Sequence, residues 1–176
     1  MTPERSRPYH FTLEDVIRLA REVALEHGGH VPTLIVEGSG GSVVGQMTDL
    51  PDTHEARRRW MFSAGFALAQ SGQVGLLRQV FFISEGWMST AGADGTIEVP
   101  PSQDPNRQEV LFVSSLKVKE RRTDMALFEM VRDGEGRLTE LRRIQQPGEE
   151  EGGHVESRLS AAFVDGFCMG TGVRLS

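Results

Sequence analysis

The chain of 176 residues contains one cysteine, Cys168, and no hydrophobic run near the length of a membrane-spanning helix. A single cysteine excludes an intramolecular disulfide and any metal site built from several thiolates. It is also typical of proteins in a reducing compartment, so the sequence predicts a cytoplasmic protein. A membrane helix needs about 20 apolar residues, and the first residues carry charge and proline instead of the apolar segment of a secretory signal. No association with a membrane is predicted.

Basic charge is also scarce, because the formal net charge is −6 and only two of the 19 basic residues are lysine. Proteins that bind nucleic acid without sequence preference neutralise phosphates with clustered Lys and Arg side chains. The two local basic clusters, 57–59 and 117–122, have no interleaved aromatic residues that could stack on bases. The sequence therefore predicts no nucleic-acid partner.

Several catalytic and cofactor motifs are missing. His54-Glu55 lacks the spacer residue of the zinc deaminase motif, and a downstream Pro-Cys-x-x-Cys is absent. Gly38-Ser39-Gly40-Gly41 lacks the Lys-Ser/Thr ending of a phosphate-binding loop, and the residues around Ser84 do not form a nucleophile elbow. The sequence predicts no cofactor.

Two histidines are spaced closely enough to be candidates for a shared metal ion. His27 and His30 are three residues apart, but Gly28-Gly29 between them interrupts the helix that would hold both on one face. We therefore expect a helix end followed by a loop histidine, and no metal.

The clearest element is an amphipathic helix over residues 13–27. Thr12 is a capping residue, Asp15 stands three positions later, and apolar residues recur at helical spacing up to Gly28. Short β-rich runs follow at 31–37 and 42–47, and the glycines between them predict a hairpin.

A second helix is predicted over residues 55–70, capped by Asp52 or Thr53. Beyond its three arginines it is apolar nearly all round, which is typical of a helix buried on two sides. Small residues such as Ser63 and Gly65 would let another backbone approach closely. We expect this helix to lie between the sheet and a second layer, or between two subunits.

Strands are predicted at 79–84, 109–118, 124–132 and 137–144, and a last helix at 156–167. The fold class is therefore α+β, a largely antiparallel sheet with interleaved helices in the order α-β-β-α-β-β-β-(β)-α. The expected organisation is a flexible arm (1–11) and a single domain (12–176) with an exposed acidic linker (145–154) before the last helix.

A long loop, 88–108, separates two of these strands, and loops of this length commonly bind something or order themselves as a cap. Glu37 and Glu85 follow the apolar parts of their strands, where a small-molecule site is often built. One hypothesis is therefore a small hydrolase-like enzyme that uses Glu37 or Glu85 as its general base in a pocket under this loop.

The same region offers candidate binding residues. Trp87 could supply an aromatic wall, and Asp104, Arg107 and Glu109 stand at the far end of the loop. In a second interpretation the loop is held by internal contacts: Arg107 pairs with Glu85 or Glu109, Asp104 forms a turn, and Trp87 packs under the loop.

The segments 80–87 and 101–110 resemble those of a group of uncharacterised bacterial proteins of about this size. That resemblance implies no activity and transfers no catalytic residues. The element order alone is also similar to Roadblock and profilin-like scaffolds, and a shared order of elements does not define a function.

The leading hypothesis is a non-enzymatic interaction or small-ligand-binding domain. We expect it to form a homodimer through the helix at 55–70 or through a sheet edge, with an unidentified small molecule or protein as a further partner. The hydrolase is the alternative, and an accessory protein of a phage or mobile element is a third class that the residues do not separate from the first.

Overall fold

The computed structural model describes residues 10–89, 103–145 and 158–172. Most of the predicted arm (1–11) and of the predicted linker (145–154) lies outside the described residues, as does the centre of the loop 88–108. The described elements follow one another in the order α-β-β-α-β-β-β-β-α, which confirms the α+β prediction. They are α1 (Leu13–His27), β1 (Thr33–Gly38), β2 (Gly41–Gln46), α2 (His54–Ser71), β3 (Leu77–Met88), β4 (Gln108–Lys117), β5 (Arg122–Arg132), β6 (Leu138–Ile144) and α3 (Arg158–Thr171).

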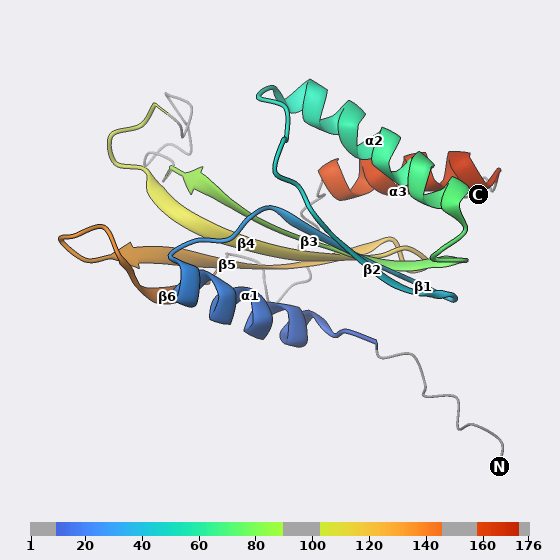
Figure 1. Ribbon diagram of the computed structural model, residues 1–176. Coiled ribbons are helices and arrows are strands. Elements are labelled where there is room, and N and C mark those ends of the chain that lie inside the picture. The colour runs from blue at the N-terminus through green and yellow to red at the C-terminus, as the bar shows by residue number, and fades with distance from the viewer. Residues whose placement is uncertain (1–9, 90–102, 146–157, 173–176) are drawn as a thin grey trace, which may run out of the picture.

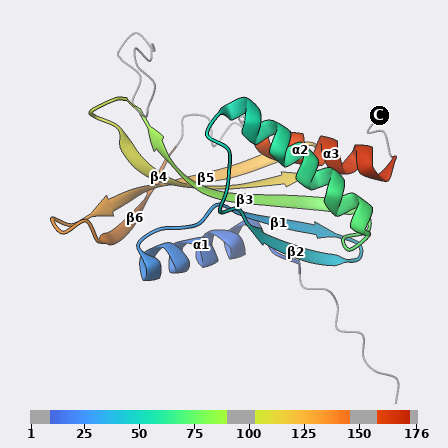
Figure 2. The ribbon, with the colours of Figure 1, turned by 45° about the horizontal axis from the view of Figure 1, so that its top comes forward.

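The six strands form one antiparallel sheet in the order β2-β1-β3-β4-β5-β6. α1 covers one face of this sheet, and α2 and α3 lie side by side on the other (Figures 1 and 2). None of the described helices is both long and apolar enough to cross a membrane.

Alternation along the strands divides the core into two clusters, one on each face. On β3, Phe81 and Ile83 point toward α1, whereas Val80 and Phe82 point toward the α2–α3 pair. Because both faces are covered, the central strands are apolar on both sides and show little alternation in sequence.

The ends of α1 are those predicted from the sequence. The backbone N–H of Asp15 donates to the Thr12 hydroxyl at 3.2 Å, and the Asp15 carboxylate accepts from the backbone N–H of Thr12 at 2.9 Å. The helix ends at Gly28, whose φ of 76° is in the left-handed region that glycine adopts without a steric cost.

The small residues of α2 do admit a second backbone, and that backbone belongs to α3 of the same chain. A Cβ atom added to Gly65 would collide with the carbonyl oxygen of Phe163, and one added to Gly166 would collide with that of Phe62. The two helices therefore approach closely along a line of glycines. α2 is covered by the sheet and by α3, while its outer side stays exposed.

β3 is longer than the sequence predicts. The expected strand ends at Ser84, but β3 continues through Glu85 and Trp87 to Met88. The residues Ser84-Glu85-Gly86 have a sequence typical of a turn. Pairing with β4 nevertheless keeps them in the strand, because β3 and β4 pair without interruption as far as Met88 opposite Gln108. Strand length here is decided by a long-range partner.

Candidate functional site

Glu37, the first candidate base, lies inside β1 and is 2% exposed. Its Oε1 atom accepts a hydrogen bond from the backbone N–H of Phe11 at 2.9 Å and another from the Ser42 hydroxyl at 3.4 Å. Phe11, the last residue of the predicted arm, also packs against the core beneath α1. Glu37 therefore fixes the segment that leads into α1.

Glu85, the second candidate base, has a matching role at the other end of the same helix. Its Oε1 atom accepts a hydrogen bond from the backbone N–H of His30, two residues past the Gly28 cap. α1 has 15 residues and is about 22 Å long at 1.5 Å per residue. Because Glu37 and Glu85 contact opposite ends of α1, they do not share one site.

Glu109 is paired with an arginine that the sequence interpretation did not consider. The Arg132 guanidinium donates to both carboxylate oxygens of Glu109, at 2.6 and 2.8 Å, and to the carbonyl oxygen of Gly28 at 3.0 Å. The Glu109 hydrogen bonds, with a smaller contribution from the charge of Glu85, raise the pKa of Arg132. A bidentate pair of this kind joins β4, β5 and the end of α1.

A signal for Arg132 was present in the sequence. It follows Phe128 and Met130 at strand spacing, so alternation places it on the face that carries α1. A charged side chain in line with core residues needs a partner. Identifying Glu109 as that partner required the register of β4 against β5.

The structure brings Trp87, Arg107 and Asp104 together near Glu109. Trp87 lies directly opposite Glu109 in the β3–β4 ladder, and the Arg107 guanidinium lies over the Trp87 ring at 4.2 Å from its centroid. Asp104 forms the expected turn, because its side chain accepts the backbone N–H of Asn106 at 2.8 Å and its carbonyl accepts that of Arg107 at 3.2 Å. The pocket expected under the loop would need residues 90–102, which lie outside the described residues.

The two candidate metal ligands do not converge. His27 is an exposed residue of the last turn of α1, and the Nδ1 atom of His30 is 2.7 Å from the carbonyl oxygen of Val31. Over the described ranges, no group of three or more His, Cys, Asp or Glu side chains has the arrangement needed to hold a metal ion.

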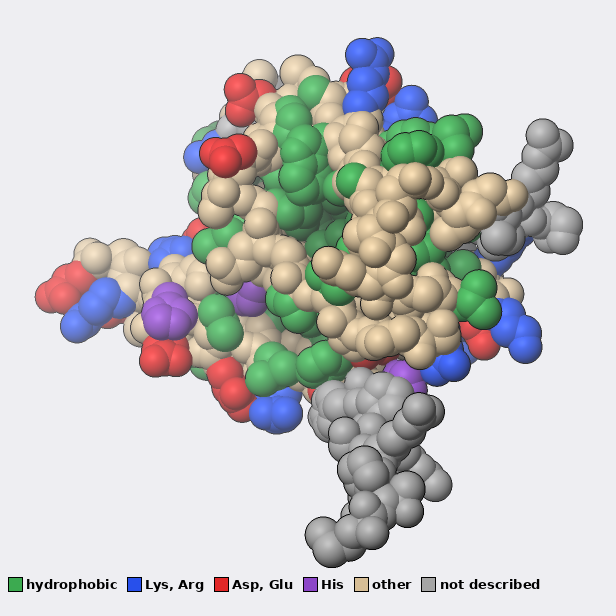
Figure 3. All heavy atoms as spheres, turned by 45° about the vertical axis from the view of Figure 1, so that its right-hand side comes forward, with side chains coloured by type: hydrophobic (Ala, Val, Ile, Leu, Met, Phe, Trp, Pro, Cys, Tyr) green, Lys and Arg blue, Asp and Glu red, His purple; other side chains and the backbone are tan. Residues whose placement is uncertain are grey.

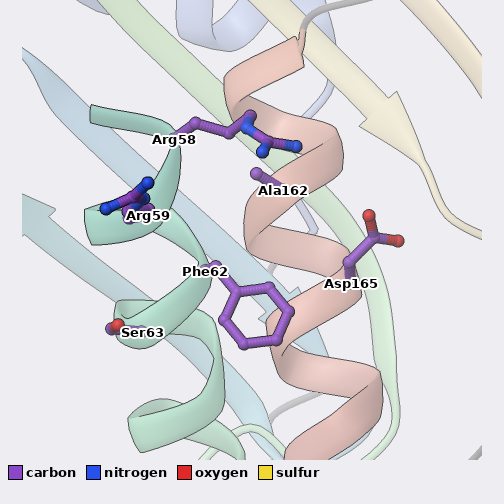
Figure 4. A pocket seen from close by; sticks show the side chains of 6 residues that line it. All are labelled: Arg58, Arg59, Phe62, Ser63, Ala162 and Asp165. Atoms are coloured by element: carbon purple, nitrogen blue, oxygen red, sulfur yellow. The ribbon is translucent and has the colours of Figure 1, made fainter. Parts of the chain in front are cut away.

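A hollow of about 530 Å³ opens on the outer side of the helix pair (Figure 4). Arg58 reaches from α2 toward α3, the Phe62 ring lies between the helices, and Asp165 stands on α3. Arg59 and Ser63 border it on the α2 side. Arg58 and Arg59 both pair with Glu55, at 3.3 and 3.1 Å, and these contacts lower the pKa of the Glu55 carboxyl.

The thiol of Cys168 is not activated. Burial, and secondarily the negative charge of Asp165, raises its pKa. Because the thiolate is the reactive form of cysteine, a raised pKa disfavours nucleophilic use of this residue.

Comparison with protein-family models, with curated proteins and with solved structures gives no match to this chain.

Proposed function

We propose that this protein is a non-enzymatic interaction domain that forms a homodimer through the outer side of α2. The proposal depends on one observation: Trp60 and Phe66, at 37% and 40% exposure, stand three residues on either side of the exposed Ser63. Positions 60, 63 and 66 lie close together on one side of a helix, whereas solvent-exposed helix surfaces usually carry polar residues there. An exposed apolar surface of this kind is typical of a protein–protein contact.

This stripe, defined by Trp60, Ser63 and Phe66, is complementary to a second copy of itself. A two-fold axis beside Ser63 would run the two α2 helices antiparallel and set Trp60 opposite Phe66 of the second copy. The small Ser63 side chains would meet at the centre, where the backbones approach most closely. Isologous contacts need this kind of self-complementary spacing.

Charge also favours the antiparallel arrangement. The last turn of α2 contains no basic residue, so the negative end of its helix dipole has no compensating side chain. In the dimer, Arg59 would stand opposite Ala67 of the second copy, close to that uncompensated end. Arg59 carries 77% of its maximal side-chain exposure in the single chain, so it is accessible for this contact.

The surroundings of the stripe also favour this side of α2 as the contact surface of the dimer. In Figure 3, hydrophobic side chains gather in the upper half of the view, on the side of the molecule that carries α2 and α3, with charged side chains around them. The hollow beside Ser63 and Phe62 adjoins the stripe and enlarges the surface that a second copy could cover.

The non-enzymatic part of the proposal follows from the roles of the candidate bases. Glu37 and Glu85 each accept a backbone N–H and contact different ends of α1. A general base must instead reach the proton that it abstracts. The single cysteine is consistent with a reducing cytoplasm as the compartment.

Sedimentation equilibrium over a wide concentration range tests the dimer, with Trp60→Glu and Phe66→Glu as the variants. The wild type should sediment as a dimer and both variants as monomers, because each substitution places a carboxylate in the apolar contact. Leu76→Glu is the matched control: Leu76 is 71% exposed and lies outside α2, so this variant should remain dimeric.

A monomeric wild type would contradict the proposal. Dimeric Trp60→Glu and Phe66→Glu variants would also contradict it. In that case the edge strand β2 is the alternative contact surface. β2 has no charged residue and exposes Val44, as an edge open to pairing does. Dissociation by Val44→Lys, with Trp60→Glu still dimeric, would assign the dimer to that edge.

A further inference from the structure

β3 has an open edge, defined here as residues 84–88. The ladder between β1 and β3 ends where Thr33 pairs with Ile83. The ladder between β3 and β4 continues for five more residues, to Met88 opposite Gln108. Within the described part of the chain, β3 therefore has a strand on one side only over residues 84–88. In Figure 1 the arrowhead of β3 extends beyond the start of β1.

The hydrogen-bond pattern shows which backbone groups face that open side. Val118 donates its N–H to the carbonyl of Arg78 at 3.0 Å, and these residues directly precede and follow the first pair of the β3–β4 register, Gln79 opposite Lys117. Hydrogen-bonded pairs alternate along an antiparallel ladder, so the even-numbered residues of β3 bond to β4 and the odd-numbered residues face away from it. Beyond Ile83 the odd-numbered residues are Glu85 and Trp87.

The β1–β2 ladder gives the same alternation independently. Met47 donates its N–H to the carbonyl of Pro32 at 2.7 Å, which places the even-numbered residues of β1 toward β2 and Thr33 toward β3. The backbone N–H and C=O groups of Glu85 and Trp87 thus face the side of β3 on which β1 pairs with the earlier residues of the same strand. Among the described residues, no strand pairs with β3 on that side of residues 84–88.

The residues just before β1 do not pair with β3, because their backbone groups make other contacts. The carbonyl of Val31, just before β1, is engaged by the Thr33 hydroxyl at 2.8 Å and by the His30 ring. The backbone N–H of His30 is bound by the side chain of Glu85 and not by its backbone. The connection from α1 therefore reaches β1 without extending the ladder.

We propose that the open edge of β3 binds an extended peptide segment of a partner protein, which adds a strand antiparallel to Glu85–Trp87. Four backbone groups in strand spacing specify a main-chain ligand, as in other cases of β-strand addition. The two side chains that flank Gly86 point to the α1 side: Trp87 is 47% exposed, and Glu85, whose Oε1 atom accepts the His30 N–H, is partly exposed.

The side chains along this edge also indicate the chemistry of the peptide. A Cβ atom added to Gly86 would meet no other atom within 4 Å, which leaves room on the opposite face for a large side chain from the added strand. Opposite Glu85, a basic residue would form an opposite-charge cross-strand pair. The preferred segment therefore has a bulky apolar residue opposite Gly86 followed by Lys or Arg opposite Glu85.

The probe for this site is a synthetic peptide, acetyl-Ser-Thr-Val-Phe-Lys-amide, which ends before the position that Thr33 occupies opposite Ile83; it is titrated to millimolar concentration and followed by amide NMR. In the proposed register its Val, Phe and Lys stand opposite Trp87, Gly86 and Glu85. The amides of Glu85 and Trp87 should shift and exchange more slowly with solvent. In the free protein these two amides should exchange faster than those of Ser84, Gly86 and Met88, which bond to β4.

Two N-methylated forms of this peptide test which of its backbone N–H groups bind β3. Methylation of the Val and Lys nitrogens removes the donors that face β3 and should weaken binding by at least about tenfold. Methylation of the Phe nitrogen, which faces outward, should leave affinity unchanged. On the protein, Trp87→Pro removes one edge N–H that β4 does not use, and it should reduce binding while the other β3 amides stay protected.

Three results would overturn the proposal. The first is no shift at Glu85 or Trp87 at millimolar peptide, and the second is equal affinity for all three peptides. The third is protection of both amides in the free protein that rises with protein concentration, which would identify a second copy as the occupant. None of them depends on the dimer through α2, because the Trp60→Glu variant can be used for every measurement.

Discussion

The carboxylate of Glu37 accepts the backbone N–H of Phe11 at 2.9 Å, and the two residues are 26 positions apart in the chain. Glu85 makes the equivalent contact with His30 at the other end of α1. Two acidic side chains on one face of the sheet thus hold both ends of the same helix. Residues that suggest catalysis in the sequence have a structural role here.

Glu37→Ala should lower the free energy of unfolding by about 1–3 kcal/mol, the cost of leaving a part-buried N–H without its acceptor. Glu37→Gln should cost less, because the amide oxygen can still accept from Phe11. Denaturant unfolding of both variants measures this difference. Equal losses for the two substitutions would show that the hydrogen bond is not the source of the effect.

Arg132 and Glu109 should be energetically coupled. Their side chains are 29% and 20% exposed, and the pair is bidentate, so we expect a coupling of about 1 kcal/mol in a double-mutant cycle with alanine. The exposed pair Arg18–Glu22 is the reference, with an expected coupling of about 0.3–0.5 kcal/mol. A value for Arg132–Glu109 no larger than that reference would reject a stabilising role.

Gly65→Ala and Gly166→Ala should each destabilise the protein by about 1–3 kcal/mol, because the added methyl group meets a backbone carbonyl of the neighbouring helix. Thermal unfolding compares them with Gly134→Ala, where a Cβ would meet no atom within 4 Å. If the three variants have the same stability, the close approach of α2 and α3 is not required.

Asp133 should make stability depend on pH in the acid range. The backbone N–H of Arg137, then that of Glu135, and the Arg137 guanidinium lower the pKa of Asp133 in the turn between β5 and β6. A lowered pKa in the folded state means that the contribution is present above the unfolded-state pKa and is lost as the pH falls through the folded one.

Asp133→Asn lacks this titration and is the variant to compare. The wild type should be the more stable of the two at neutral pH, and the difference should shrink as the solution is acidified below the ordinary aspartate pKa. Unfolding curves at several pH values measure it. A stability difference that stays constant down to strongly acidic pH would contradict the assigned role of the carboxylate.

Local signals in the sequence determined the order of the elements and the ends of α1. The Thr12–Asp15 capping box and Gly28 act over a few residues, and amphipathic spacing is visible along the helix itself. The turn at Asp104 was predictable for the same reason, because its hydrogen bonds span two or three residues. The apolar character of α2 correctly indicated a close helix partner, without identifying which one.

Only the tertiary structure decided the remaining features, because each depends on residues far apart in the chain. The length of β3 follows from its register with β4, and the pairing of Arg132 with Glu109 from the register of β4 with β5. The partner of Gly65 is α3, about 100 residues later, which selects the second layer of the same chain as the close neighbour at this position. Periodicity and capping describe a segment alone, whereas register and helix packing are properties of pairs of segments.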